Sequence, residues 1–131
     1  MASRIQAINA YRPRIVLGPR VETEEFADYV SSRTGLNESE VREVLYEFRD
    51  GTAFYNKQAR PVHLVGMGTY SPGLKLDGEF TVNHRADIYV KKQLNLDGEF
   101  RGEIRNREHI GMTSDELIAL WNQEHPDDPV Q

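Results

Sequence analysis

The side chains of this chain that are best suited to chemistry are basic, and the chemistry that they suit is the binding of phosphate. Lysine and arginine neutralise the phosphates of a nucleic-acid backbone, and they need no particular base to do so. Basic residues gather in two stretches, one before residue 22 that contains no acid and one between residues 75 and 92. The candidate phosphate contacts are Arg12, Arg14, Arg20, Lys75, His84, Arg85, Lys91 and Lys92.

The charge is distributed unevenly along the chain. The total is −5, yet residues 1–21 hold four arginines and no acid, while residues 96–131 hold nine acids against three bases. Binding of DNA needs a local positive potential rather than a positive total. Proteins that bind nucleic acid are nevertheless commonly basic overall. The same lysines and arginines therefore also fit an ordinary solvated surface, and composition leaves both interpretations open.

The sequence gives little support to catalysis or metal binding. It has no cysteine, and its histidines are His63, His84, His109 and His125. Their spacing is not that of metal ligands. His84 and Asp87 are close enough to pair, which we interpret as a surface contact rather than an acid–base dyad. We therefore expect no enzyme, no cofactor and no metal.

Length and hydropathy fit one soluble domain. A chain of 131 residues can bury a single modest core. No apolar run approaches the roughly 20 residues of a membrane-spanning helix, and polar residues interrupt the first ten positions, which argues against a secretory signal. The absence of cysteine fits a reducing compartment. We expect a cytoplasmic protein with no membrane partner.

Two amphipathic helices are predicted over residues 23–34 and 37–55. Thr23 is the expected N-cap of the first helix and Gly35 its C-terminal stop. Asn37 is the expected N-cap of the second, with Glu40 at the capping-box position. Their apolar residues recur every three or four positions, so each helix has one face to bury.

From Pro61 the apolar pattern alternates, which predicts strands. Two copies of Leu-Asp-Gly-Glu-Phe, at 76–80 and 96–100, each contain the Asp-Gly pair of a tight hairpin turn. They predict three strands, up to Leu76, over 80–94 and over 100–104. On the second strand Arg85 and Lys91 would share one face, with Lys92 on the other.

The two ends of the chain add further elements. Residues 15–17 predict a short strand that stops at Gly18-Pro19. Thr113 or Ser114 caps a final helix whose apolar residues include Trp121, and residues 127–131 are expected to fray. This helix is expected to pack on the domain's own sheet or on a dimer partner. The alternative is a helix that docks another protein through Trp121.

The order helix, helix, strand and then Gly66-Met67-Gly68-Thr69-Tyr70 resembles the bacterial histone-like HU/IHF family, in its variant group with an extra N-terminal segment. The resemblance covers residues 23–94. It implies a homodimer with intertwined helices, a saddle-shaped sheet over DNA, and a β-arm from each subunit that reaches into the minor groove.

Three features depart from the family pattern. The arm, between Tyr70 and residues 88–90, is several residues shorter than usual, and its expected tip is the acidic Asp77-Gly78 without a proline wedge. The Pro-Gly that usually follows the closing strand is replaced by residues 90–92, Val-Lys-Lys. These differences favour shallow contacts to the DNA backbone over deep insertion and strong bending.

Together these observations predict an α+β, HU/IHF-like fold: a helical hairpin, an antiparallel sheet with a shortened arm, an extra N-terminal strand and a C-terminal helix. The expected divisions are a basic extension over 1–22, the HU-like core over 23–95, and an acidic segment over 96–131 that packs on the core. The expected function is low-specificity DNA binding by a nucleoid-associated homodimer. The alternative is a dimeric scaffold for protein interactions that has lost DNA.

Overall fold

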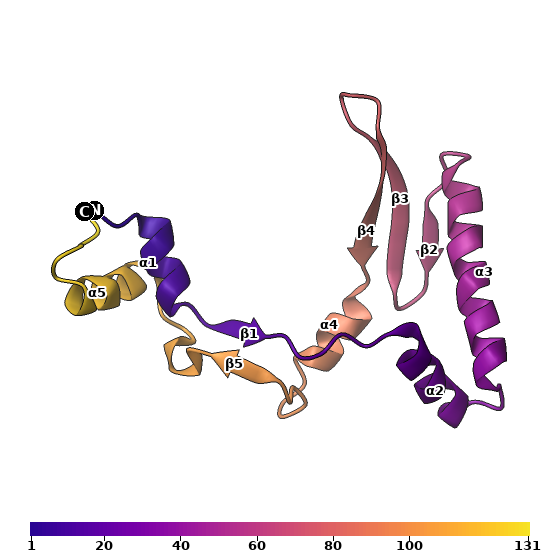
Figure 1. The fold of residues 1–131 in the computed structure, drawn as a ribbon, viewed down its shortest axis with the longest axis horizontal. Coiled ribbons are helices and arrows are strands. Elements are labelled where there is room, and N and C mark those ends of the chain that lie inside the picture. The colour runs from indigo at the N-terminus through magenta and orange to yellow at the C-terminus, as the bar shows by residue number, and fades with distance from the viewer. The chain divides into compact units, whose positions relative to one another are not determined.

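The computed structural model describes all residues, 1–131, and the chain divides into two compact units (Figure 1). The first unit combines both ends of the chain, Met1–Pro19 and Arg101–Gln131, and the second is Arg20–Phe100. The sequence suggested three consecutive parts, with residues 96–131 packed on the core. The structure differs because the C-terminal helix contacts the N-terminal helix, so that the two ends form a unit of their own.

The second unit begins with the expected helical hairpin, α2 (Thr23–Arg33) and α3 (Glu38–Asn56). The N-cap of α2 is Glu22, one residue before the predicted Thr23. Thr34 ends this helix: its hydroxyl donates to the Val30 carbonyl at 2.9 Å and accepts from the Leu36 N–H at 3.2 Å. A side-chain turn at Thr34 thus performs the role that we assigned to Gly35.

The start of α3 confirms the predicted cap. Asn37 Oδ1 accepts from the Glu40 N–H at 2.9 Å, and Asn37 Nδ2 donates to the Glu40 carboxylate at 2.9 Å. The helix then continues for five turns without interruption at Gly51.

An antiparallel sheet follows in the order β2–β3–β4, with β2 at Val62–Leu64, β3 at Gly68–Leu74 and β4 at Phe80–Ala86. Figure 1 shows β3 and β4 as a long hairpin that extends beyond β2. Its tip is the predicted Asp-Gly turn, where Gly78 has φ 92° and donates its N–H to the Lys75 carbonyl. The shortened arm is therefore this hairpin.

The predicted strand over 80–94 was wrong beyond Ala86. Residues Ile88–Leu94 form a helix, α4. The ladder stops because Ala86 pairs with Gly68, the first residue of β3, so that no partner strand extends further. Asp87 then turns the chain, donating its N–H to the Met67 carbonyl, and Asn95 closes α4 on the Lys91 carbonyl at 2.8 Å.

The first unit contains α1 (Arg4–Tyr11), β1 (Arg14–Val16), β5 (Glu103–Arg105), a 3-10 turn η1 (Arg107–His109) and α5 (Ser114–Glu124). The helix α1 was not predicted. The strand β5 pairs with β1, and not with the strand before it as the second Asp-Gly turn suggested. Ile15 opposite Ile104 gives this pair its shared apolar position.

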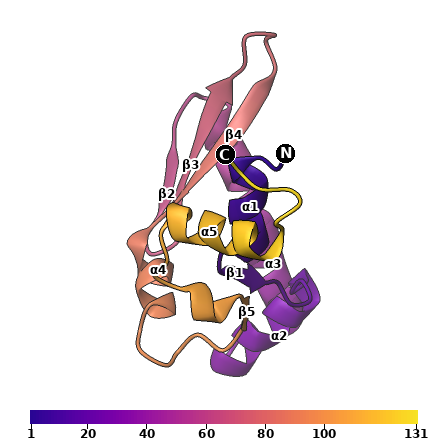
Figure 2. The same cartoon turned by 90° about the vertical axis from the view of Figure 1, so that its left-hand side faces the viewer.

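The core of the first unit consists of Ala2, Ala7, Ile118, Trp121 and Val130. The expected fraying of residues 127–131 was wrong. The Trp121 indole N–H donates to the Asp128 carbonyl at 2.8 Å, and Val130 donates its N–H to Asn122 Oδ1 at 2.7 Å. Figure 2 shows both chain ends beside α1 and α5.

Trp121 is 7% exposed and its ring stacks on His125 with centroids 3.8 Å apart. It is therefore a core residue, packed between α5 and α1, and it is not available as the docking anchor that we considered. Thr113 caps α5 as predicted, accepting from the Glu116 N–H at 3.2 Å, and the helix ends at His125. No helix of the structure has the length and apolar character needed to cross a bilayer.

Candidate nucleic-acid interface

The β3–β4 hairpin presents two different faces because its side chains alternate. Tyr70 and His84 are paired across the strands and stack with centroids 4.5 Å apart, on the face that meets α3. Asn56 of α3 donates to the Tyr70 carbonyl at 3.3 Å at the same contact. The residues next to Tyr70 and His84 along each strand have their side chains on the opposite face of the hairpin.

This opposite face, which we call the outer face, is polar throughout. It consists of Thr69, Ser71, Gly73, Thr81, Asn83 and Arg85. At Gly73 the side chains of Thr81 and Asn83 lie directly over the backbone, because a Cβ there would be 2.6 Å from the Thr81 hydroxyl and 2.9 Å from the Asn83 amide nitrogen. Hydroxyl, amide and guanidinium groups are the side chains that commonly bind DNA phosphates and sugars.

Arg85 and Lys91 meet at the end of the outer face. They line a shallow cavity of about 490 Å³ with Thr69, Ala86, Asp87 and Ile88. Neither base has a carboxylate within ion-pair distance. The sequence placed these two bases on one face of a long strand, whereas the structure brings them together at the junction of a strand and a helix.

Asp87 fixes this junction. Its carboxylate lies 3.0 Å from His63 Nε2 and accepts the Gly66 N–H at 2.9 Å. The bond from His63 is the main cause that lowers the pKa of Asp87 below its usual value; partial burial opposes the shift and the Gly66 N–H supports it. The partner of Asp87 is therefore His63, and the predicted pair with His84 was wrong because His84 points to the other face of the sheet.

The two glycines of the Gly66-Met67-Gly68 step are also needed at the junction that Asp87 holds. Gly66 has φ 82° where its N–H turns toward Asp87. Gly68 has φ 148°, and a Cβ there would lie 2.4 Å from the Arg85 carbonyl oxygen and 2.6 Å from His84 Nε2. The Gly-x-Gly step thus permits the close approach of β3 and β4 beside Arg85.

The other predicted contacts are not among the residues that line this cavity. Lys75 is at the hairpin tip, where it pairs with Glu79 at 3.2 Å, and Arg20 pairs with Glu22 at 2.8 Å. Lys92 is exposed on α4. Arg12 and Arg14 belong to the first unit. The cluster Arg85–Lys91 is therefore the part of the predicted set that the second unit brings together.

Sequence reasoning missed the polar partners of these bases, namely Thr69, Ser71, Thr81 and Asn83. The sequence did contain a signal for them, because side chains alternate along a strand. Thr69 and Ser71 are one position from Tyr70 and so lie on the face opposite to it, and Thr81 and Asn83 are an even number of positions from Arg85 and so share its face. Without the register of β3 against β4, however, the two sets could not be assigned to one face.

A second surface of this unit is apolar and open. The groove has a volume of about 550 Å³ and is lined by side chains of α2, α3 and the β2–β3 region, among them Phe26, Leu36, Val44, Phe48 and Met67. Only Ala27 and Val41 of the apolar side chains in this unit are buried. Large apolar residues left exposed in this number mark an interface.

Comparison with known proteins agrees with this architecture. Residues 5–105 match the HU-HIG family, described as an HU domain fused to a wHTH, Ig or glycine-rich motif. A search of curated proteins returned no match. The HU domain is a non-enzymatic DNA-binding architecture. Since the match covers most of the chain, and the helical hairpin, the Gly-x-Gly step and the β-arm lie within it, the chain belongs to the HU-HIG family of HU-like proteins.

Proposed function

We propose that this protein binds duplex DNA with low sequence specificity, as a homodimer, through contacts to the phosphate backbone. The observation that carries the proposal is the outer face, a polar strand surface that ends in the unpaired bases Arg85 and Lys91. Thr69, which has a hydroxyl group, lines the same cavity as these two cations. Such a group of donors suits a phosphate, which accepts hydrogen bonds and carries negative charge.

Low specificity follows from the secondary structure of the interface. Direct base recognition commonly uses a helix or ribbon whose Arg, Asn or Gln side chains enter the major groove. On the outer face the residues are short, and the only long cation is Arg85. Lys91 and Lys92 lie on α4, which is a helix of two turns. These side chains suit backbone contacts, which position a protein without conveying sequence.

Dimerisation is supported by the missing core of the second unit. A small domain with two buried apolar side chains lacks the buried area that a stable fold requires. A two-fold dimer would place the same open groove of each protomer against its partner. It would also double the number of outer faces, so that several phosphates could be contacted at once despite the net charge of −5.

The test is fluorescence anisotropy of a labelled random duplex of about 30 base pairs, titrated with protein at roughly 50 and 200 mM salt. A protein that makes six or more phosphate contacts is expected to lose on the order of a thousandfold in affinity between the two conditions. The variant R85A/K91A should bind more weakly and with a smaller salt dependence. Oligomeric state is measured in parallel by sedimentation.

The matched control is R33A/K57A, which removes one exposed arginine from the end of α2 and the exposed lysine that caps the C-terminus of α3, both in the same unit. It should bind as the parent protein does. Equal weakening by both variants would mean that only total charge matters and would remove the Arg85–Lys91 cluster from the interface. Failure of the parent protein to bind at low salt would leave the alternative, a dimeric scaffold for protein interactions.

A further inference from the structure

The first unit contains a second group of arginines that the order of the sequence conceals. β1 and β5 pair antiparallel with Arg14 directly opposite Arg105. Residues directly opposite each other on one face of such a pair have Cβ atoms about 5 Å apart. Two guanidinium groups that lie 91 positions apart in the chain are thus neighbours on one strand pair.

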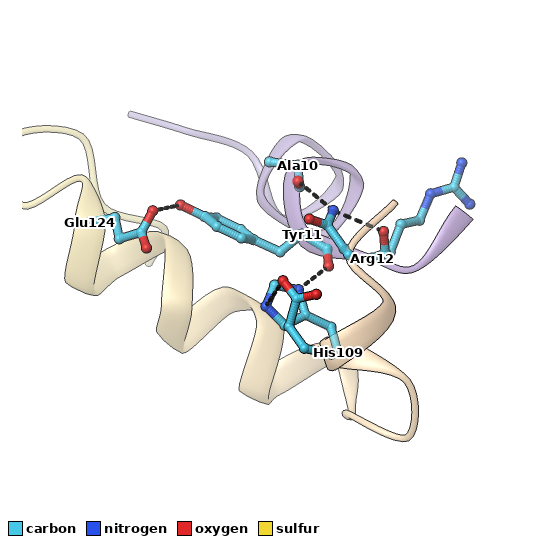
Figure 3. Close-up of polar contacts among 7 residues, drawn as sticks. Ala10, Tyr11, Arg12, His109 and Glu124 are labelled. Atoms are coloured by element: carbon cyan, nitrogen blue, oxygen red, sulfur yellow. Dashed lines mark hydrogen bonds and ion pairs between the residues drawn. The ribbon is translucent and has the colours of Figure 1, made fainter. Parts of the chain in front are cut away.

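The ladder brings two more arginines to the same end. Arg12 lies two residues before Arg14, and Arg107 lies two residues after Arg105. Because the strands are antiparallel, both residues lie at the same end of the strand pair. Asn106 ties the two segments together there, because its Nδ2 donates to the carbonyls of Ala10 at 3.2 Å and Arg12 at 3.1 Å. In Figure 3 the Arg12 side chain extends away from the contact between Tyr11, His109 and Glu124.

Three acids of this unit are engaged elsewhere. Asp115 pairs with Arg4 at 3.0 Å, Asp128 with the N-terminal amine at 3.2 Å, and Glu124 accepts the Tyr11 hydroxyl. Glu103 shares the strand face with Arg14 and Arg105, and Glu108 lies 3.6 Å from His109 Nε2. No carboxylate is within ion-pair distance of the four arginines, all of which are exposed.

We infer that Arg12, Arg14, Arg105 and Arg107 form a second phosphate-binding surface, through which the first unit contacts the backbone of the same DNA. Like charges placed directly opposite on a strand pair are destabilising, and a polyanion would offset that repulsion. Guanidinium groups also bind phosphate in a bidentate manner. This inference rests on the proposed function, since it assigns a second contact to a protein that binds DNA.

A two-surface arrangement has a consequence for affinity. The units are joined by two chain crossings, at residues 19–20 and 100–101. Binding by one surface therefore holds the other at a high local concentration near the duplex, and affinity rises without any new specific contact. Removing the second surface should weaken binding without abolishing it.

The experiment compares the full chain with R105A/R107A in the anisotropy titration, over several salt concentrations. Loss of two phosphate contacts from each protomer of the proposed homodimer should lower the slope of log K against log salt by about 3.6 and weaken binding at least about tenfold at roughly 0.1 M salt. The control R4A/R101A removes two arginines from the same unit, away from the four-arginine end. It should leave both quantities unchanged.

Stability of the free protein separates binding from folding. Because R105A relieves the repulsion with Arg14, the free R105A/R107A variant should melt at the same temperature as the parent or higher. The fluorescence of Trp121, the only tryptophan, reports that the first unit is folded. Weaker DNA binding with unchanged stability supports the second surface.

Parent-like binding by R105A/R107A overturns this inference, and if R85A/K91A still weakens binding the proposed function stands. Equal weakening by R4A/R101A overturns it as well, because net charge alone would then explain the loss. A parent protein that does not bind the duplex removes the proposed function and this inference together.

Discussion

The two units of this protein solve the problem of burying apolar surface in different ways. The first unit closes a small core from both ends of the chain, with Trp121, Ile118 and Ala7 buried together. The second has a longer helical hairpin and more apolar residues, but it leaves Phe48 and Val44 about half exposed. The number of apolar residues therefore does not decide whether a core is complete. The geometry that brings those residues into contact decides it.

Part of the difference lies in connectivity. In the first unit α1 and α5 come from opposite ends of the sequence and pack on each other, and the C-terminal residues fold back over Trp121. In the second unit α3 packs on β2 and β3, and no further element of that unit fills the groove lined by α2, α3 and the β2–β3 region. A second protomer would supply what the chain itself does not, which predicts that the two units respond differently to substitution.

The largest effect is expected from V44D, which puts a carboxylate into the open groove of the second unit. If the groove is a dimer interface, burying this charge should cost several kcal/mol and dissociate the dimer. Sedimentation and circular dichroism measure the loss. The control V65D introduces the same charge in the β2–β3 turn, where Val65 is 90% exposed, and should stay dimeric. A V44D variant that sediments as the parent would refute the interface.

The corresponding test of the first unit is W121A. Removing a buried tryptophan commonly costs about 3–5 kcal/mol, and here it also removes the hydrogen bond to the Asp128 carbonyl. Hydrogen exchange should show lost protection in residues 1–19 and 101–131, while Arg20–Phe100 stays protected. Loss of protection throughout the chain would show that the units are not independent. W121F, which keeps an aromatic ring, should have a smaller effect.

A smaller effect is expected from G68A, which tests how closely β3 and β4 must approach. The added Cβ would lie 2.4 Å from the Arg85 carbonyl oxygen, at a backbone φ of 148°. Strain of this kind costs about 1–3 kcal/mol, measured as a shift in denaturant midpoint. The control is G18A, where a Cβ meets nothing within 4 Å. An equally mild result for both would mean that the hairpin base adapts.

The smallest effect concerns pH. Because the folded state lowers the pKa of Asp87, its ionised form contributes stability above the unfolded pKa of about 4, and the contribution is lost as pH falls through the lower folded value. Thermal melts between about pH 3 and 6 should show this loss in the parent protein. D87N should be less stable near pH 6 and depend less on pH. An unchanged pH profile would show that Asp87 is not a stabilising anchor.

Much of the fold and part of the site could be predicted because the signals were local. The Asn37–Glu40 cap, the Thr113 cap, the Asp77-Gly78 turn and the Gly66-x-Gly68 step each depend on residues within a few positions of one another. Capping and turn conformation are set by backbone geometry over one turn of chain. The same locality allowed Arg85 and Lys91 to be identified as candidate bases.

What the sequence by itself determined was therefore the helical hairpin, the arm and the family to which they belong. Tertiary structure decided the rest. Residues 88–94 became a helix because β3 offers no partner beyond Gly68, and the second Asp-Gly turn formed no hairpin because β5 pairs with β1. The pairing of β1 with β5 also placed Arg14 opposite Arg105. Strand pairing joins residues far apart in the chain, and no local pattern specifies which distant segment will be the partner.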